Sequence, residues 1–147
     1  MLRLIPAVMI VLFLAALSHE VDARDKSGVL KASDLIGMEV EGTDGKNVGQ
    51  ILDLVIDAAD ASIDYAVLDF GGILGIGDKY FAVPWDALAW TDDRKKITLD
   101  VTKKDLKQAP GFDKNNWPDL SDRTQSVVIY EFYGVPVRSE PDAARGK

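Results

Sequence analysis

The 147-residue sequence contains no cysteine and a single histidine, His19. The absence of cysteine excludes disulfide bonds, iron–sulfur clusters, thiolate zinc sites and a thiol nucleophile. Basic residues are also in the minority, with 17 Lys and Arg against 24 Asp and Glu, so the net charge is −7. A protein that binds nucleic acid usually has the opposite balance, and we expect no nucleic-acid partner. The apolar fraction of 47% and charged fraction of 28% are typical of a globular domain.

The first 23 residues have the layout of a secretory signal peptide. A positively charged start at Arg3 is followed by an apolar stretch from Leu4 to Leu17, and Val21-Asp22-Ala23 places small residues at the −3 and −1 positions. We predict cleavage after Ala23 and a periplasmic or secreted protein. The alternative is an uncleaved membrane anchor, but the apolar stretch is shorter than the roughly 20 residues that a spanning helix needs.

Cleavage at this position would remove His19 and leave neither His nor Cys in the mature chain. Histidine-based acid–base catalysis, histidine triads and the usual zinc, copper and iron ligand sets would then be excluded. We therefore expect no catalytic residues, no metal and no cofactor.

Residues 38–101 read as short strands joined by turns. Asp44-Gly45 is a strong hairpin signal, and Gly49 predicts a bend or bulge inside a long strand. Ile63–Phe70 is apolar on both faces, which suits a strand that is covered on both sides. About six sequential antiparallel strands predict a mainly β domain that closes into a small barrel, since closure removes exposed sheet edges. The expected strands are Met38–Glu41, Val48–Asp57, Ile63–Phe70, Lys79–Val83, Asp86–Trp90 (a strand or a turn) and Lys96–Val101.

Short helices are expected on either side of these strands. Lys31–Ile36 reads as a helical turn or loop that ends at Gly37. Thr102 and Asp105 have the spacing of a capping box and predict a helix of about two turns that ends at Ala109.

The C-terminal part is harder to assign. We expect Phe112–Ser121 to be irregular. Gln125–Tyr133 is ambiguous, because Val127-Val128-Ile129 favours a strand whereas Tyr130 and Tyr133 are one helical turn apart; we prefer the helix. Arg138–Lys147 is polar and is predicted to be a loose tail.

Several segments in this order resemble the PRC-barrel family, the small β-barrel domains of the photosynthetic reaction-centre H subunit and the ribosome maturation factor. The resemblance extends from Ala32 to about Ser121 and implies a mainly β barrel that acts in binding or assembly, usually with protein partners, and that carries no catalytic residues. Together with the signal peptide and the polar tail, the resemblance divides the chain into a signal peptide at 1–23, a PRC-type barrel at 32–103, a C-terminal extension packed on the barrel at 104–137 and a flexible tail at 138–147. The segments that carry it are Leu35-Ile36-Gly37, Asp44-Gly45 with Val48-Gly49, Asp53–Asp57, Gly71–Trp85 and Leu99–Asp122.

Three possible chemical sites are weak. The loop Gly71–Lys79 suggests phosphate binding, but no Ser or Thr follows the lysine. The element expected next is a strand, whereas a phosphate-binding loop is followed by the N-terminus of a helix. Asp57, Asp60 and Asp64 lack the ligand spacing of a calcium loop. The paired carboxylates Asp53/Asp57 and Asp92/Asp93 would need a cleft to act as acid and base, and a small filled barrel offers none.

Two functional hypotheses remain. The first is a non-enzymatic, exported protein-binding or assembly module of the bacterial cell envelope, whose unidentified protein partner could be a second copy of the chain and whose candidate interaction surface is Trp117, Tyr130, Phe132 and Tyr133. The alternative is a small-ligand or anion-binding module that uses the candidate loop Gly71, Gly72, Gly75, Gly77 and Lys79 with the basic residues Arg94-Lys95-Lys96 and Lys103-Lys104. Membrane contact is expected only through an uncleaved signal.

Overall fold

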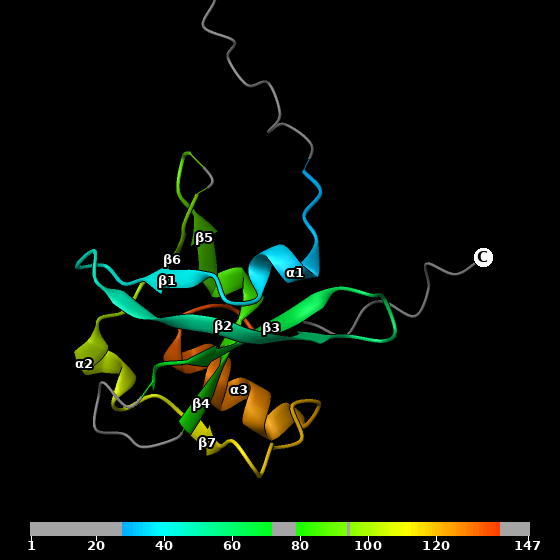
Figure 1. Ribbon diagram of the computed structural model, residues 1–147. Helices are drawn as coiled ribbons and strands as arrows, with labels where there is room; N and C mark the ends of the chain where they lie inside the picture. Colours follow the sequence, from blue (N-terminus) through cyan, green and yellow to red (C-terminus); the bar gives the residue numbers. More distant parts are fainter. Residues whose placement is uncertain (1–27, 72–78, 94, 139–147) are drawn as a thin grey trace, which may run out of the picture.

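A computed structural model describes residues 28–71, 79–93 and 95–138. One curved seven-stranded sheet forms the centre of the protein, with the strand order β5-β6-β1-β2-β3-β4-β7 (Figure 1). Its strands are β1 (Glu39–Glu41), β2 (Asn47–Ile56), β3 (Ile63–Asp69), β4 (Lys79–Pro84), β5 (Leu88–Trp90), β6 (Ile97–Leu99) and β7 (Gly111–Asp113). The helices are α1 (Ala32–Leu35), the 3-10 turn η2 (Trp85–Ala87), α2 (Lys103–Leu106) and α3 (Arg123–Phe132).

The predicted mainly β class is confirmed, but the expected closed antiparallel barrel is wrong in two respects. Strands β1 and β6 pair in parallel, with Val40 opposite Ile97. The chain leaves β4 through η2 and reaches the far end of the sheet, where the β5–β6 hairpin brings β6 alongside β1 in the same direction. Within the described ranges, β7 also does not pair with β5. The sheet is therefore open, and its two edges are these strands of three residues each.

The meander β2–β3–β4 is the backbone of the sheet and follows the sequence prediction closely. Gly49 has φ +142 at the point where the β1–β2 register shifts, which confirms the expected bulge. Both faces of β3 are covered: Ala66 and Leu68 belong to the main core, whereas Tyr65 belongs to a second core on the opposite face.

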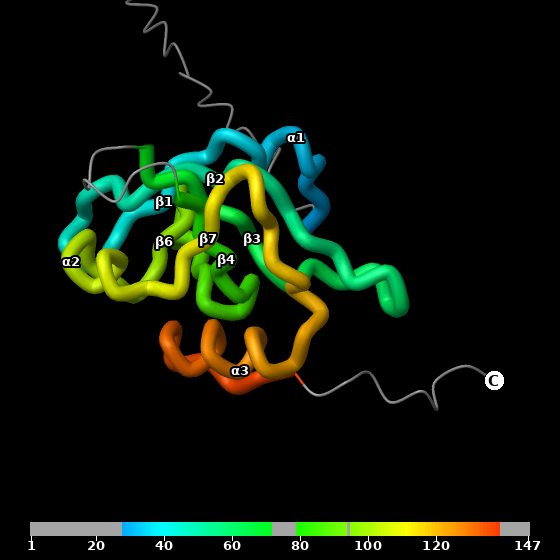
Figure 2. Tube along the Cα trace, turned by 90° about the horizontal axis from the view of Figure 1, so that it is seen from below, coloured from blue at the N-terminus to red at the C-terminus, as the bar shows by residue number. Residues whose placement is uncertain are grey.

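Each face of the sheet is covered by its own hydrophobic core. The main core lies in the curve of the sheet and is closed at its ends by Leu35 of α1 and Leu106 of α2. The second core lies under α3, which runs along the other face of the sheet (Figure 2). Ile129 and Tyr130 of α3 pack there on Tyr65 and Ala82.

The C-terminal elements correct two details. The Thr102 capping box is present, but α2 ends at Leu106 because the next hydrogen bonds, from Gln108 to Asp105 and from Ala109 to Leu106, tighten to i→i+3 spacing. Phe112 and Asp113, expected at the start of the irregular stretch Phe112–Ser121, instead belong with Gly111 to strand β7, because the free edge of β4 offers them backbone partners. The preferred helix over Gln125–Tyr133 is confirmed by α3.

Candidate functional site

Capping hydrogen bonds at the two ends of α3 fix the path of the C-terminal chain. At its start, the Asp122 carboxylate accepts a hydrogen bond from the Thr124 amide at 2.7 Å. At its end, the Gly134 amide donates to the Glu131 carbonyl and the Val135 amide to the Tyr130 carbonyl, with Gly134 at φ +68. This pair of bonds is a Schellman turn, and it sends the chain from α3 back toward the β2–β3 hairpin.

Arg138 ties that returning segment to the sheet. Its guanidinium donates two hydrogen bonds to the Asp86 carboxylate, both at 2.9 Å, and others to the Ser62 hydroxyl and the Ile63 carbonyl, both at 3.1 Å. The Asp64 carboxylate is 3.4 Å away. Bidentate guanidinium–carboxylate pairs fix geometry as well as charge. Arg138, placed by sequence in the loose tail, is therefore held at the sheet by residues more than 50 positions earlier.

A groove of about 560 Å³ opens beside this contact. It lies between the β2–β3 hairpin, which projects from the body of the protein in Figure 1, the first half of α3 and the segment that ends at Arg138. Apolar groups form one part of its lining, namely Val55, Ile56, Ala58, Leu120, Val137 and the rings of Tyr65 and Tyr130. Polar groups form the rest, namely Asp57, Asp60, Ser62, Asp64, Ser121, Arg123, Ser126 and Arg138. We call it the hairpin groove.

The charges in the hairpin groove act on one another. Hydrogen bonds from Arg138 lower the pKa of Asp86, although partial burial opposes them. The pKa of Asp64 is raised, first by burial and then by the negative charge of Asp57, and Arg138 compensates only in part. Burial is therefore the main reason that the pKa of Asp64 lies above its ordinary value, and the charge of Asp57 adds to it.

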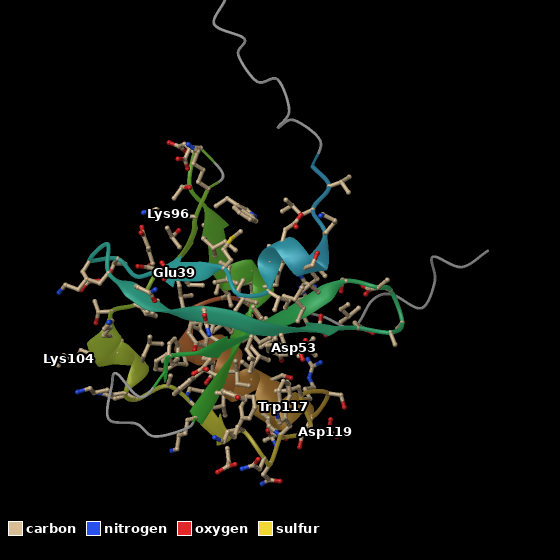
Figure 3. All side chains as sticks on the ribbon, in the orientation of Figure 1. Glu39, Asp53, Lys96, Lys104, Trp117 and Asp119 are labelled. Atoms are coloured by element: carbon tan, nitrogen blue, oxygen red, sulfur yellow. The ribbon has the colours of Figure 1, made fainter. Side chains whose placement is uncertain are left out.

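An apolar groove of about 290 Å³ lies on the other side of α3. It runs between β7 and α3 and is lined by Pro110, Gly111, Phe112, Pro118, Thr124, Gln125, Val128 and Ile129. Trp117, labelled near α3 in Figure 3, has its ring 5.2 Å from that of the lining residue Phe112 and 6.4 Å from that of Tyr80. The side chains of Trp117 and Val128 are 42% and 54% exposed. We call this region the Trp117 face.

The four residues of the candidate interaction surface do not share one surface. Trp117 is exposed, whereas Tyr130 is buried and packs edge-on against Tyr65 at 5.7 Å. Tyr133 touches both cores, and its hydroxyl is buried without a hydrogen-bond partner among the described residues. Phe132 is half-buried against Tyr133. Tyr130 and Tyr133 fill the space between α3 and the sheet because the helix turns them inward, and the sequence spacing alone did not distinguish the two faces.

The glycine loop and the basic cluster give less support for an anion site. Gly72, Gly75 and Gly77 lie outside the described residues. Gly71 has φ +50, and Lys79 begins β4 as an exposed residue. In the basic cluster, Lys96 forms an ion pair with Glu41, whereas Lys104 belongs to α2 and is labelled apart from Lys96 in Figure 3. Arg94 also lies outside the described residues.

The hairpin groove was missed by sequence reasoning. Its lining comes from three separate segments around residues 55–65, 120–130 and 137–138, and no spacing in the sequence connects them. The signal in the sequence was the turn with three carboxylates, Asp57, Asp60 and Asp64, which the sequence predicts to be turn-forming. Asp57 and Asp60 do cap this turn, since their carboxylates accept hydrogen bonds from the amides of Ala59 and Ser62.

None of the helices described above has the length and apolar character that crossing a bilayer requires. Within the same ranges, no group of three or more His, Asp or Glu side chains is arranged to hold a metal ion.

Sequence comparison agrees with the architecture. No curated protein matches the chain. The family model of the PRC-barrel domain matches residues 27–106, which is more than half of the chain and covers α1 through α2. The matched segment holds six of the seven strands and most of the main core, and the chain therefore belongs to the PRC-barrel domain family.

Proposed function

We propose that this protein is a non-enzymatic, exported PRC-barrel protein that acts as a protein-binding or assembly module of the bacterial cell envelope. In this proposal the curved sheet is a rigid platform, and α3 with β7 presents the contact surface.

The observation that carries the proposal is the Trp117 face. Exposed large apolar side chains that gather beside a groove are characteristic of protein-interaction sites, and tryptophan is among the residues that interfaces favour most. Val128 of α3 lines the apolar groove, and Trp117, which follows β7 in the chain, packs its ring on the groove residue Phe112. Of the predicted interaction residues, Trp117 is thus the one in the best position to contact a partner.

The residue inventory supports a non-enzymatic role. Residues 24–147 contain neither His nor Cys, the two side chains that most often supply acid–base and nucleophilic chemistry near neutral pH. PRC-barrel domains are generally binding or assembly modules, and this agrees with the inventory. Export is supported by the signal-peptide layout of residues 1–23.

Photo-crosslinking in intact cells tests the binding role. A photoreactive amino acid is placed at position 117 or 128 of the full-length chain, and a matched control carries it at the exposed Asp100, outside both grooves. We expect positions 117 and 128 to capture the same protein, which can be a second copy, and position 100 to capture little of it. Equal capture from all three positions, or none from 117 and 128, contradicts the proposal.

The mass of the exported protein tests processing independently. A mature chain that begins at or near Arg24 supports export, whereas a mass that corresponds to all 147 residues contradicts cleavage.

A further inference from the structure

The hairpin groove contains a tyrosine whose hydroxyl has no hydrogen-bond partner among residues 28–71, 79–93 and 95–138. Tyr130 is only 3% exposed and lines the groove. Within the described part of the chain its hydroxyl makes no hydrogen bond, and it is not fully enclosed by protein atoms. Its neighbour Tyr65, in contrast, donates to the Ser126 hydroxyl at 3.0 Å. Buried hydroxyls are nearly always hydrogen-bonded, so the Tyr130 hydroxyl is available to a group that enters the groove.

Negative charge gathers on the hairpin side of the groove. Asp57 and Asp60 each use one carboxylate oxygen to cap the turn, through the amides of Ala59 and Ser62. The Ser62 side chain also hydrogen-bonds to Asp60, and both bonds lower the pKa of this carboxyl. The second oxygen of Asp57 has no hydrogen-bond donor among the described residues. Asp64 has only a 3.4 Å contact with Arg138. The lining thus offers two carboxylates, those of Asp57 and Asp64, that are only partly satisfied.

Two arginines also line the groove, but neither neutralises these carboxylates fully. Arg138 directs its two shortest bonds to Asp86, which is not part of the lining. Arg123 is exposed at the start of α3 and forms no ion pair within the described ranges. Arg138 also demonstrates which chemistry the hairpin accepts, because its guanidinium contacts the Ser62 hydroxyl, the Ile63 carbonyl oxygen and, at 3.4 Å, the Asp64 carboxylate.

The rest of the lining suits the stem of such a cation. Val55, Leu120 and the Tyr65 ring provide apolar surface next to the carboxylates, and alkyl stems of amines pack on surfaces of this kind. An anion would meet Arg123 but would also have to approach three carboxylates, and a purely apolar ligand would leave the Tyr130 hydroxyl without a partner. The lining therefore discriminates by charge as well as by shape.

We propose that the hairpin groove binds an organic cation, an ammonium or guanidinium group on an apolar stem. The charged end meets Asp57 and Asp64, the stem lies over Tyr65, and the Tyr130 hydroxyl accepts a hydrogen bond from the cation. The same chemistry is available from a lysine or arginine side chain of a partner protein and from a free polyamine. This site is separate from the Trp117 face and does not depend on the function proposed above.

The test is a titration of the full chain followed by amide chemical shifts in NMR spectra. The probes are Nα-acetyl-lysine N-methylamide for a protein side chain and spermidine for a free polyamine; Nα-acetyl-norleucine N-methylamide has a similar apolar stem without the ammonium. We expect saturable shifts at groove residues with at least one cationic probe and none with the norleucine probe. Preference for the lysine probe identifies a protein side chain as the source, and preference for spermidine identifies a polyamine. Equal shifts with norleucine, or no saturable shifts with either cation, overturn the proposal.

Three variants locate the binding. Asp64→Asn removes one charge while it keeps the side-chain shape, and we expect about tenfold weaker binding. Tyr130→Phe removes only the hydroxyl, leaves every charge in place and is expected to weaken binding about threefold. The matched control, Asp100→Asn, removes an exposed carboxylate outside the groove and leaves binding unchanged. Thermal melts verify that each variant folds, and an equal loss in the control indicates diffuse charge attraction and refutes the site.

Discussion

Gly49 offers a demanding test of the fold, because its substitution by alanine combines two separable costs. The residue lies in β2 at φ +142, a backbone conformation that residues with a side chain rarely adopt. A Cβ at this position would lie 2.5 Å from Cδ1 of Phe70 and 2.9 Å from the Asp69 carbonyl oxygen. The Phe70 ring cannot move away easily, because it is buried and its centroid is 4.5 Å from that of Phe81.

The magnitude follows from these two contributions. Backbone strain in this region costs about 1–3 kcal/mol, and forced overpacking of a filled core adds about 1–3 kcal/mol. Gly45→Ala is the matched control, since Gly45 also has a positive φ, +70, but nothing lies within 4 Å of its added Cβ. The control should lose only the strain, about 1–2 kcal/mol. The two variants therefore separate the steric contact from the backbone conformation.

Urea unfolding followed by tryptophan fluorescence measures both losses. Trp85 and Trp90 pack against the main core and report its disruption. We expect Gly49→Ala to lower the free energy of unfolding by about 2–6 kcal/mol, enough to unfold a marginal domain. If Gly49→Ala is no more destabilising than Gly45→Ala, the close packing of Phe70 on β2 is refuted.

Three further outcomes are expected. Replacing Arg138 by Gln in a double-mutant cycle with Asp86→Asn should give a coupling of about 0.5–1.5 kcal/mol in urea unfolding, the range for a bidentate pair that is partly open to water; additive losses would mean that the pair contributes nothing. Burial raises the pKa of Tyr133 above its ordinary value of 10.0, so the stability that the neutral hydroxyl maintains is complete below about pH 10 and declines as the pH rises further, by about 1.4 kcal/mol per pH unit. Tyr133→Phe should reduce this alkaline decline in pH-dependent melts and should cost nothing at neutral pH, because it removes a buried hydroxyl without a partner; an unchanged alkaline slope would contradict the assignment. Adding a chelator should leave the melting temperature unchanged, and a drop of several degrees would reveal a structural metal.

The part of the fold that was predictable from sequence is the part built from local signals. The β2–β3–β4 meander follows from alternating apolar residues and a turn rich in Asp, and the α2 start follows from the Thr102–Asp105 spacing. The β1–β6 pair was not predictable in this way, because its direction depends on where the chain goes after η2. Strand β7 has only three residues and acquires its conformation from the free edge of β4.

The candidate sites show the same division. Aromatic composition placed Trp117 and Tyr130 in one candidate surface. It could not show that Trp117 is exposed whereas Tyr130 faces inward, since the direction of Tyr130 depends on how α3 rotates on the sheet. Arg138 carried no sequence signal, because its partners Asp86 and Ser62 are brought to it only by the completed sheet and the Schellman turn.

The position of β1 between β2 and β6 has a consequence for the order of folding. One edge of β1 pairs with β2, its neighbour in sequence. The other edge pairs with β6 (Ile97–Leu99), which is synthesised more than 50 residues later. Pairing across such a long stretch of chain is slow, because the loop must close before the contact stabilises anything. A chain that emerges from its N-terminus first, from a ribosome or through a translocation channel, therefore completes the β2–β3–β4 meander early and exposes an unpaired β1 edge until β6 arrives. Unpaired edges invite association with other chains, so this interval is the period in which the protein most needs protection from aggregation.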